Sequence, residues 1–148
     1  MDNVDMLVYN YSREPLNAEK VTWEAEAAAR ADKVFIVNEF PWKLSQIEEL
    51  KSFLEIIEST EDVSGSLYYD LVPHADNFGF IETKDPYALR YPGGSAASWS
   101  RIEKLRNHAY RMRGANIAPP HRVPAAPQIS WNHGAELAWR GAAVANEY

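Results

Sequence analysis

The chain has 148 residues, a formal net charge of −6 and no cysteine, and its length is that of one typical domain. The lack of cysteine excludes disulfides, thiolate nucleophiles and cysteine-ligated zinc. Hydrophobic residues make up 46% of the chain and charged residues 24%, so the composition predicts a folded domain rather than a disordered one.

The sequence predicts neither a membrane span nor a secretory leader. No segment approaches the roughly 20 apolar residues that a spanning helix needs. The first five residues, MDNVD, carry acids where a signal peptide has lysine or arginine. We therefore expect an intracellular protein that is not secreted, either cytosolic or virion-associated, with an organelle interior as the alternative.

The first predicted elements alternate between strand and helix. Residues 6–9, MLVY, indicate a short strand. Residues 18–31 predict a helix, because they are rich in alanine and one face repeats at spacings of three and four; this face holds Val21, Ala25, Ala28 and Ala31. Residues 34–37, VFIV, favour a buried strand. Phe35 also continues the helical stripe four residues after Ala31, which leaves a longer helix as the alternative.

A second helix is predicted from Ser45 to about Ser59. Ser45 and Glu48 have the spacing of a capping box, in which the serine hydroxyl accepts the amide proton of the third residue after it. The apolar residues then repeat at three, four and three, which is typical of an amphipathic helix. Its core face is expected to hold Ile47, Leu50, Leu54 and Ile57.

The middle of the chain is predicted to form a loop followed by a β-hairpin. Residues 60–66 predict a polar loop, and residues 67–72 and 78–83 predict two strands. The five residues between these strands fit a hairpin connection. Proline and glycine predict turns at residues 85–86 and 91–94.

A third helix is predicted to open at a second capping box, Ser100 to Glu103, and to end at Gly114. The serines at 95 and 98 are interpreted as turn and helix-entry residues rather than nucleophiles. One face of the helix is expected to be apolar, through Ile102, Leu105, Ala109 and Met112. The helix and its end are also strongly basic, with Arg101, Lys104, Arg106, Arg111 and Arg113.

Beyond Asn116 the pattern changes to a proline-rich arm. Four prolines between residues 119 and 127 favour an extended backbone. The arm also contains the apolar residues Ile117, Val123, Ile129 and Trp131, and Asn132 is predicted to cap a short terminal helix with Leu137, Trp139 and Val144. The predicted fold is therefore a small α+β domain over residues 1–116, with about three helices and a β-hairpin, followed by an arm over residues 117–148.

Few sequence motifs indicate catalysis or metal binding. His74 and Asp76, with Asp70 nearby, form a weak candidate metal site in the predicted hairpin loop, where polar residues are also common without any ligand. There is no nucleophile elbow, phosphate-binding loop or dinucleotide fingerprint. We expect no cofactor, and a catalytic role is the less favoured one.

Charge divides unevenly along the chain. Residues 1–89 have 18 acids and 7 bases, a net of −11, whereas residues 90–148 have 3 acids and 8 bases, a net of +5. The two halves are expected to neutralise each other within one fold. The basic helix is otherwise expected to bind an acidic protein surface, with a nucleic-acid backbone as the less favoured alternative because the whole chain is acidic.

The function predicted from these patterns is that of a non-catalytic structural or accessory subunit in a larger assembly, such as a virion neck or a multisubunit organellar complex. Its partners would be other protein subunits, with copies of itself as one option, bound through the arm and aromatic residues. The candidate interaction residues are Arg101, Lys104, Arg111, Arg113, Trp131 and Trp139. The alternatives are a nucleic-acid adaptor that uses residues 101–113, and a small enzyme or metal protein with a site around His74 and Asp76.

Overall fold

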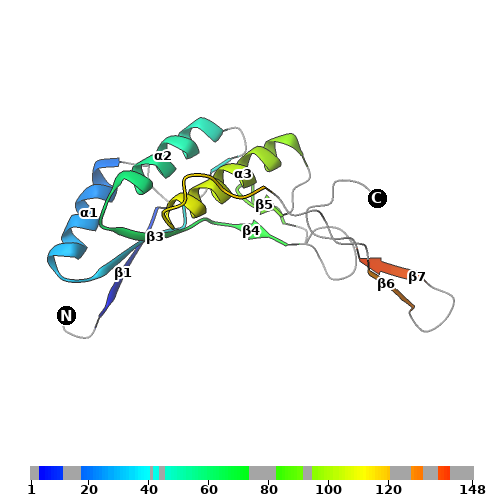
Figure 1. Cartoon of the computed structure of the whole chain (residues 1–148), viewed down its shortest axis with the longest axis horizontal. Coiled ribbons are helices and arrows are strands. Elements are labelled where there is room, and N and C mark those ends of the chain that lie inside the picture. Colours follow the sequence, from blue (N-terminus) through cyan, green and yellow to red (C-terminus); the bar gives the residue numbers. More distant parts are fainter. Residues whose placement is uncertain are drawn as a thin grey trace.

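The computed structural model describes residues 4–11, 18–40, 42–43, 46–73, 83–91 and 95–120, together with strands at 128–131 and 137–140. Over these residues the chain is a small α+β domain with three helices, as the sequence predicted. Its first half is a β–α–β–α–β unit (Figure 1). The elements of that unit are β1 (Met6–Asn10), α1 (Ala18–Arg30), β2 (Val34–Asn38), α2 (Ile47–Ser59) and β3 (Val63–Leu67).

The three strands form a parallel sheet in the order β1-β2-β3. Met6 pairs with Val34 and Asn10 with Asn38, while Asn38 also pairs with Leu67 on the other side. The two helices make the crossovers between consecutive strands. Because such crossovers have one hand and both step in the same direction, both helices must cover the same face. Figure 1 shows α1 and α2 together on one side of the strands.

The core lies between that face and the helices. The predicted helical stripes supply it: Val21, Ala25 and Ala28 from α1 are buried, as are Leu50, Leu54 and Ile57 from α2. Phe35 and Val37 face them from β2. Ile47 is only partly buried, and Ala31 lies beyond the end of α1 and is exposed.

The end of α1 confirms the strand at 34–37 over the longer helix. Asp32 has a positive φ of 53°, the left-handed conformation that often ends helices. The amide of Asp32 donates to the carbonyl of Ala29 at 2.9 Å, and that of Lys33 donates to Ala28 at 3.0 Å. These two bonds form a Schellman ending without glycine, so Phe35 belongs to β2.

The predicted cap of α2 is one residue out of place. Gln46 is the N-cap residue and makes no side-chain cap; its carbonyl accepts the first helical bond from Leu50 at 3.2 Å. Its side-chain oxygen instead accepts the amide proton of Lys43 at 3.2 Å. The predicted cap residue, Ser45, lies outside the described residues.

The predicted polar loop at 60–66 is wrong, because Val63–Leu67 is the third strand. Its central residues, Ser64, Gly65 and Ser66, have low strand propensity, but pairing with β2 overrides it. A side chain at Gly65 would come within 3.2 Å of the Cδ1 atom of Ile36. The glycine therefore leaves room for a neighbouring side chain of β2.

The middle strands also differ from the predicted hairpin. Residues 67–72 are not one strand: Leu67 ends β3, and β4 covers Leu71–Val72. β4 pairs in parallel with β5 (Leu89–Arg90). The other predicted strand lies, apart from Thr83, outside the described residues. The turn at Asp85 is confirmed, since its carboxylate accepts the amide proton of Tyr87 at 2.8 Å.

The third helix, α3 (Ala96–Arg111), begins earlier than predicted. Ser95 is the N-cap, and its hydroxyl accepts the amide proton of Ser98 at 3.1 Å, so Ser100 lies inside the helix. The end at Gly114 is confirmed: its φ is 79°, and the amide of Ala115 donates to Tyr110 at 3.0 Å. The buried face differs from the predicted stripe, because Ala109 is exposed; the buried residues are Ser98, Arg101, Ile102 and His108.

The arm contains two paired strands, β6 (Gln128–Trp131) and β7 (Leu137–Arg140). They pair antiparallel, with Ile129 opposite Trp139 and Trp131 opposite Leu137. The predicted terminal helix is therefore wrong at Leu137 and Trp139. Val123, Asn132 and Val144 lie outside the described residues.

Across the described residues, no helix combines the length and the apolar character that crossing a membrane requires.

Candidate functional site

The predicted interaction residues do not form one basic surface. Arg101 is fully buried, so the prediction that it offers a charge to a partner is wrong for this structure. Arg111 binds Glu58, Lys104 is half-buried and Arg113 is exposed. Trp131 and Trp139 lie in β6 and β7.

The predicted metal site cannot be placed, because His74 and Asp76 lie outside the described residues. Their neighbour Asp70 is described, and its buried Oδ1 atom has no hydrogen-bond partner among the described residues. Within the described ranges, no three His, Asp or Glu side chains gather as metal ligands do.

Arg101 joins α3 to two connections of the sheet. Its Nη1 atom donates to the carbonyl of Trp42 and, at 3.2 Å, to the hydroxyl of Tyr68, while Nη2 donates to the carbonyl of Lys43. Trp42 and Lys43 lie between β2 and α2, and Tyr68 directly follows β3. The guanidinium therefore fixes the start of α3 against the carboxyl ends of two parallel strands.

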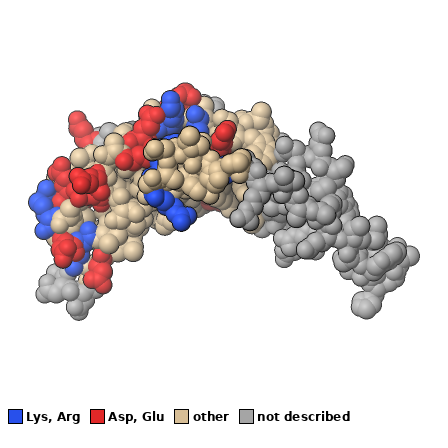
Figure 2. Space-filling view, in the orientation of Figure 1, with Lys and Arg blue, Asp and Glu red and all other residues tan. Residues whose placement is uncertain are grey.

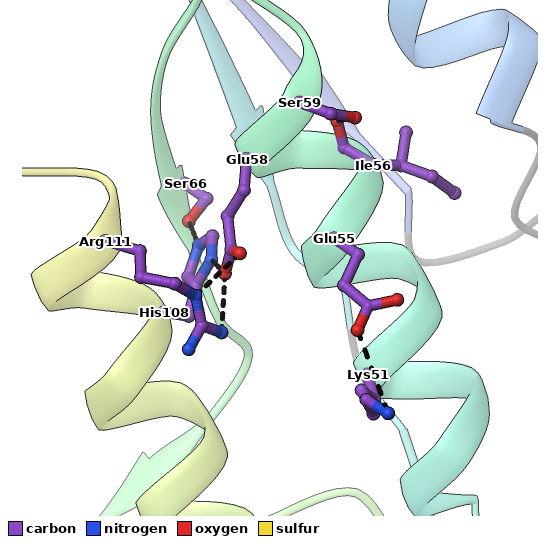
Figure 3. A network of polar contacts seen from close by, with 8 residues as sticks. All are labelled: Lys51, Glu55, Ile56, Glu58, Ser59, Ser66, His108 and Arg111. Carbon is purple, nitrogen blue, oxygen red and sulfur yellow. Dashed lines mark hydrogen bonds and ion pairs between the residues drawn. The ribbon is translucent and has the colours of Figure 1, made fainter. Parts of the chain in front are cut away.

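A second polar cluster joins α2, β3 and α3. Figure 3 shows Glu58, Ser66 and Arg111 around the ring of His108. His108 Nε2 lies 2.7 Å from the Ser66 hydroxyl oxygen, and Nδ1 lies 2.8 Å from a carboxylate oxygen of Glu58. Arg111 donates two hydrogen bonds to the same carboxylate, at 2.7 and 2.8 Å. We call these four residues the α2–α3 clamp.

The protonation states in the clamp follow from its surroundings. Burial lowers the pKa of His108, although the Glu58 carboxylate opposes this shift. Burial alone would raise the pKa of Glu58, but hydrogen bonds and charge from Arg111 and His108 hold it below its usual value. With His108 neutral and Glu58 ionised, Nδ1–H donates to the carboxylate and Nε2 accepts from the Ser66 hydroxyl.

The order serine, histidine and carboxylate is also that of a catalytic triad, but the placement favours a structural role. Ser66 pairs with Val37, whose side chain faces the covered core, and His108 is only 4% exposed. Arg111 already neutralises the carboxylate that would stabilise a charged imidazole. We therefore interpret the clamp as the attachment of α3. Labelling of Ser66 by a fluorophosphonate probe would contradict this interpretation.

The protonation states of the clamp predict that the free energy of unfolding decreases in two steps as the pH is lowered. The lowered pKa of His108 means that the unfolded chain binds more protons below about pH 6.5, so the free energy of unfolding should fall as pH decreases from there. Below about pH 4.5 the lowered pKa of Glu58 should add a second loss of the same sign.

Urea unfolding at several pH values measures this dependence. Substituting His108→Gln should lower stability near pH 7.5 and reduce the slope between pH 6.5 and 5, because the titrating group is gone. An unchanged slope in the variant would show that His108 does not titrate as inferred.

Among the described residues no helix covers the opposite face of the parallel sheet, which carries exposed apolar residues together with Asn10 and Asn38. Met6 and Val8 of β1 are each 51% exposed, Val34 of β2 is 41% exposed and Leu67 of β3 is 58% exposed. Their neighbours Leu7, Phe35 and Val37 point to the core instead, as strand alternation requires. We call the outward residues Met6, Val8, Val34 and Leu67 the outer face.

Charge lies mainly elsewhere on the body. In Figure 2, acidic side chains gather over the end of the body that carries α1 and β1. The Glu58–Arg111 ion pair links a residue of the acidic half of the chain to one of the basic half. The outer face presents methionine, valine and leucine, and the hydrogen-bonded pair Asn10 and Asn38 lies on the same side of the sheet.

No protein-family model matches the chain, and a search of curated proteins finds no match. The sites above therefore rest on the geometry of this chain alone.

Proposed function

We propose that the chain is a non-catalytic accessory domain that binds another protein subunit through the outer face of its sheet and its C-terminal arm. The observation that carries this proposal is the exposure of Met6, Val8, Val34 and Leu67 on one face of a parallel sheet. Parallel sheets are nearly always covered on both faces. Met6, Val8 and Val34 adjoin one another, whereas Leu67 lies beside Asn38 on the same face. Exposed apolar residues gathered on one face are typical of a protein-binding surface.

The arm gives further support. Ile117, where the arm begins, is 83% exposed, although the adjoining Ala118 is buried. Among the described residues β6 and β7 pair only with each other, and a two-stranded hairpin alone is only marginally stable in water. Both features favour a state in which the arm contacts something beyond its own two strands.

The nucleic-acid alternative is disfavoured by how α3 uses its positive charges. Arg101 is buried against backbone carbonyls, Arg111 is paired with Glu58, and Arg106 donates to the carbonyl of Pro119. Only Lys104 and Arg113, among the five predicted basic residues, have no such bond within the described residues. Phosphate binding depends on several such charges acting together.

Affinity purification from the native host tests the proposal. The full chain should retain one stoichiometric partner subunit, and Val8→Ser/Leu67→Ser should lose it. The same subunit, identified by mass spectrometry and purified, should then bind the wild-type chain but not this variant. Trp23→Ser is the matched control, because Trp23 is 64% exposed but lies on α1. Equal binding by the face variant and the control would contradict the proposal.

A further inference from the structure

The backbone of β1 is paired along one side only. The amide of Val34 in β2 donates to the carbonyl of Asp5 at 3.0 Å, and the parallel register continues from there along β1. Because successive residues of a strand turn their amides and carbonyls to alternate sides, Met6, Val8 and Asn10 direct theirs away from β2. Among the described residues no strand pairs with β1 on that side, since the order of the sheet is β1-β2-β3.

The two edge strands of this sheet are built differently. Proteins usually protect a sheet edge with charged residues, prolines or a β-bulge. The pairing of β3 with β2 is irregular, with a register shift between Phe35 and Ile36, and β3 contains Gly65. β1 has the sequence MLVYN, without charge, proline or glycine, and its register with β2 is unbroken. β1 is therefore a regular, uncharged edge that another strand can extend.

The sequence of β1 is complementary to a second copy of itself. An antiparallel arrangement centred on Val8 places the two Val8 residues opposite each other and Met6 opposite Asn10, so all five residues of β1 are paired. The neighbouring acid, Asp5, then lies opposite residue 11 and not opposite its own copy. A contact between two copies of a chain with net charge −6 must avoid opposed carboxylates, and this register does so.

We propose that β1 is a dimerisation edge, at which two copies of this chain pair antiparallel about Val8 and join their three-stranded sheets into one. Directly opposed residues lie on the same face of a sheet, so the two Val8 side chains meet on the outer side and the two outer faces become continuous. A two-fold contact of this kind closes on itself. The inference goes beyond the proposed function, because it uses the backbone edge of β1 and leaves the joined outer faces open to the partner subunit.

Charge exchange at residue 8 tests this pairing in the full chain. Light scattering coupled to size-exclusion chromatography should give the wild type twice its mass of 16.8 kDa at micromolar concentration. Val8→Lys and Val8→Glu each place two like charges opposite one another and should raise the dissociation constant at least about tenfold. An equimolar mixture of the two variants should recover the dimer, because opposite charges then face each other.

The matched control is Val34→Ser/Leu67→Ser, which changes the outer face on β2 and β3 but not on β1. This variant should leave the dimer unchanged, and circular dichroism checks that each variant is folded. A dimer that both charge variants leave intact, or a mixture that does not recover it, would overturn the inference.

Amide hydrogen exchange in the wild type identifies the edge without any substitution. In the dimer, the amides of Met6 and Asn10 should exchange at least about tenfold more slowly than after dilution to monomer. The amides of Leu7 and Tyr9 bond to β2 in both states and should stay protected in both. A wild-type monomer at every micromolar concentration, or a dimer in which the Met6 and Asn10 amides exchange as in the monomer, contradicts the pairing.

Failure of this inference is distinguishable from failure of the proposed function. A monomeric wild type that still binds its purified partner subunit, with binding lost in Val34→Ser/Leu67→Ser, overturns the dimer and leaves the accessory function standing. A dimer that responds to the charges at residue 8, but whose subunit binding is unaffected by the outer-face variant, overturns the proposed function and leaves the dimer standing.

Discussion

Substituting Leu54→Ala is expected to lower the free energy of unfolding by about 2–5 kcal/mol. Leu54 lies on α2 and is 1% exposed, between the sheet and the other helices. Truncation removes most of a buried side chain and leaves a cavity, because its neighbours Phe35, Leu50 and Ile57 are equally buried and belong to packed elements. Chemical denaturation measured by circular dichroism gives the difference directly.

The control is the next residue along α2. Glu55 is exposed and forms an ion pair with Lys51 at 3.8 Å. Glu55→Ala should therefore change stability by less than about 1 kcal/mol. A loss below about 0.5 kcal/mol for Leu54→Ala would contradict the packing of α2 on the sheet.

Substituting Arg101→Met is expected to lower stability by about 2–4 kcal/mol. Methionine retains much of the length of the side chain but no donors, so the carbonyl oxygens of Trp42 and Lys43 lose their bonds. The bond to Trp42 is buried and the bond to Lys43 partly buried, and a buried acceptor left without a partner costs about 1–3 kcal/mol. The cost is partly offset because a charge no longer has to be buried.

Lys104→Met provides the comparison, because Lys104 lies on the same helix and is only half-buried. It should alter stability by less than about 0.5 kcal/mol. Protease sensitivity of the segment after β2 should rise in Arg101→Met but not in Lys104→Met. Equal stability of the two variants would show that Arg101 does not anchor α3.

The helices and the first two strands could be predicted because their signals are local and strong. The stripe at Val21, Ala25 and Ala28 and the stripe from Leu50 to Ile57 repeat with the helical period. β3 could not be predicted in the same way, since Ser64, Gly65 and Ser66 are poor strand formers. Their strand is imposed by pairing with β2, and that pairing is not encoded in the segment itself.

The start of α3 was misplaced because one sequence pattern has two structural meanings. Serine and glutamate three residues apart form a capping box at a helix start, but they are also ordinary neighbours within a helix. Ser100 and Glu103 are such neighbours, and Ser95 makes the cap instead.

The α2–α3 clamp could not be predicted from the sequence. His108 contacts Glu58 and Ser66, which are 50 and 42 residues away, and no local motif joins them. The outer face was equally hidden, because strands with apolar residues on both faces do not reveal which face the helices leave uncovered.

The reactivity of single cysteines tests the central claim most directly, because the chain contains no cysteine of its own. Val8→Cys places a thiol on the outer face, and Ala29→Cys places one on the exposed side of α1. In the assembled state the thiol of Val8→Cys should react with a maleimide at least about tenfold more slowly than that of Ala29→Cys. In the chain without a bound partner, the two rates should become similar. Equal rates in both states would contradict the claim that another protein surface covers the outer face.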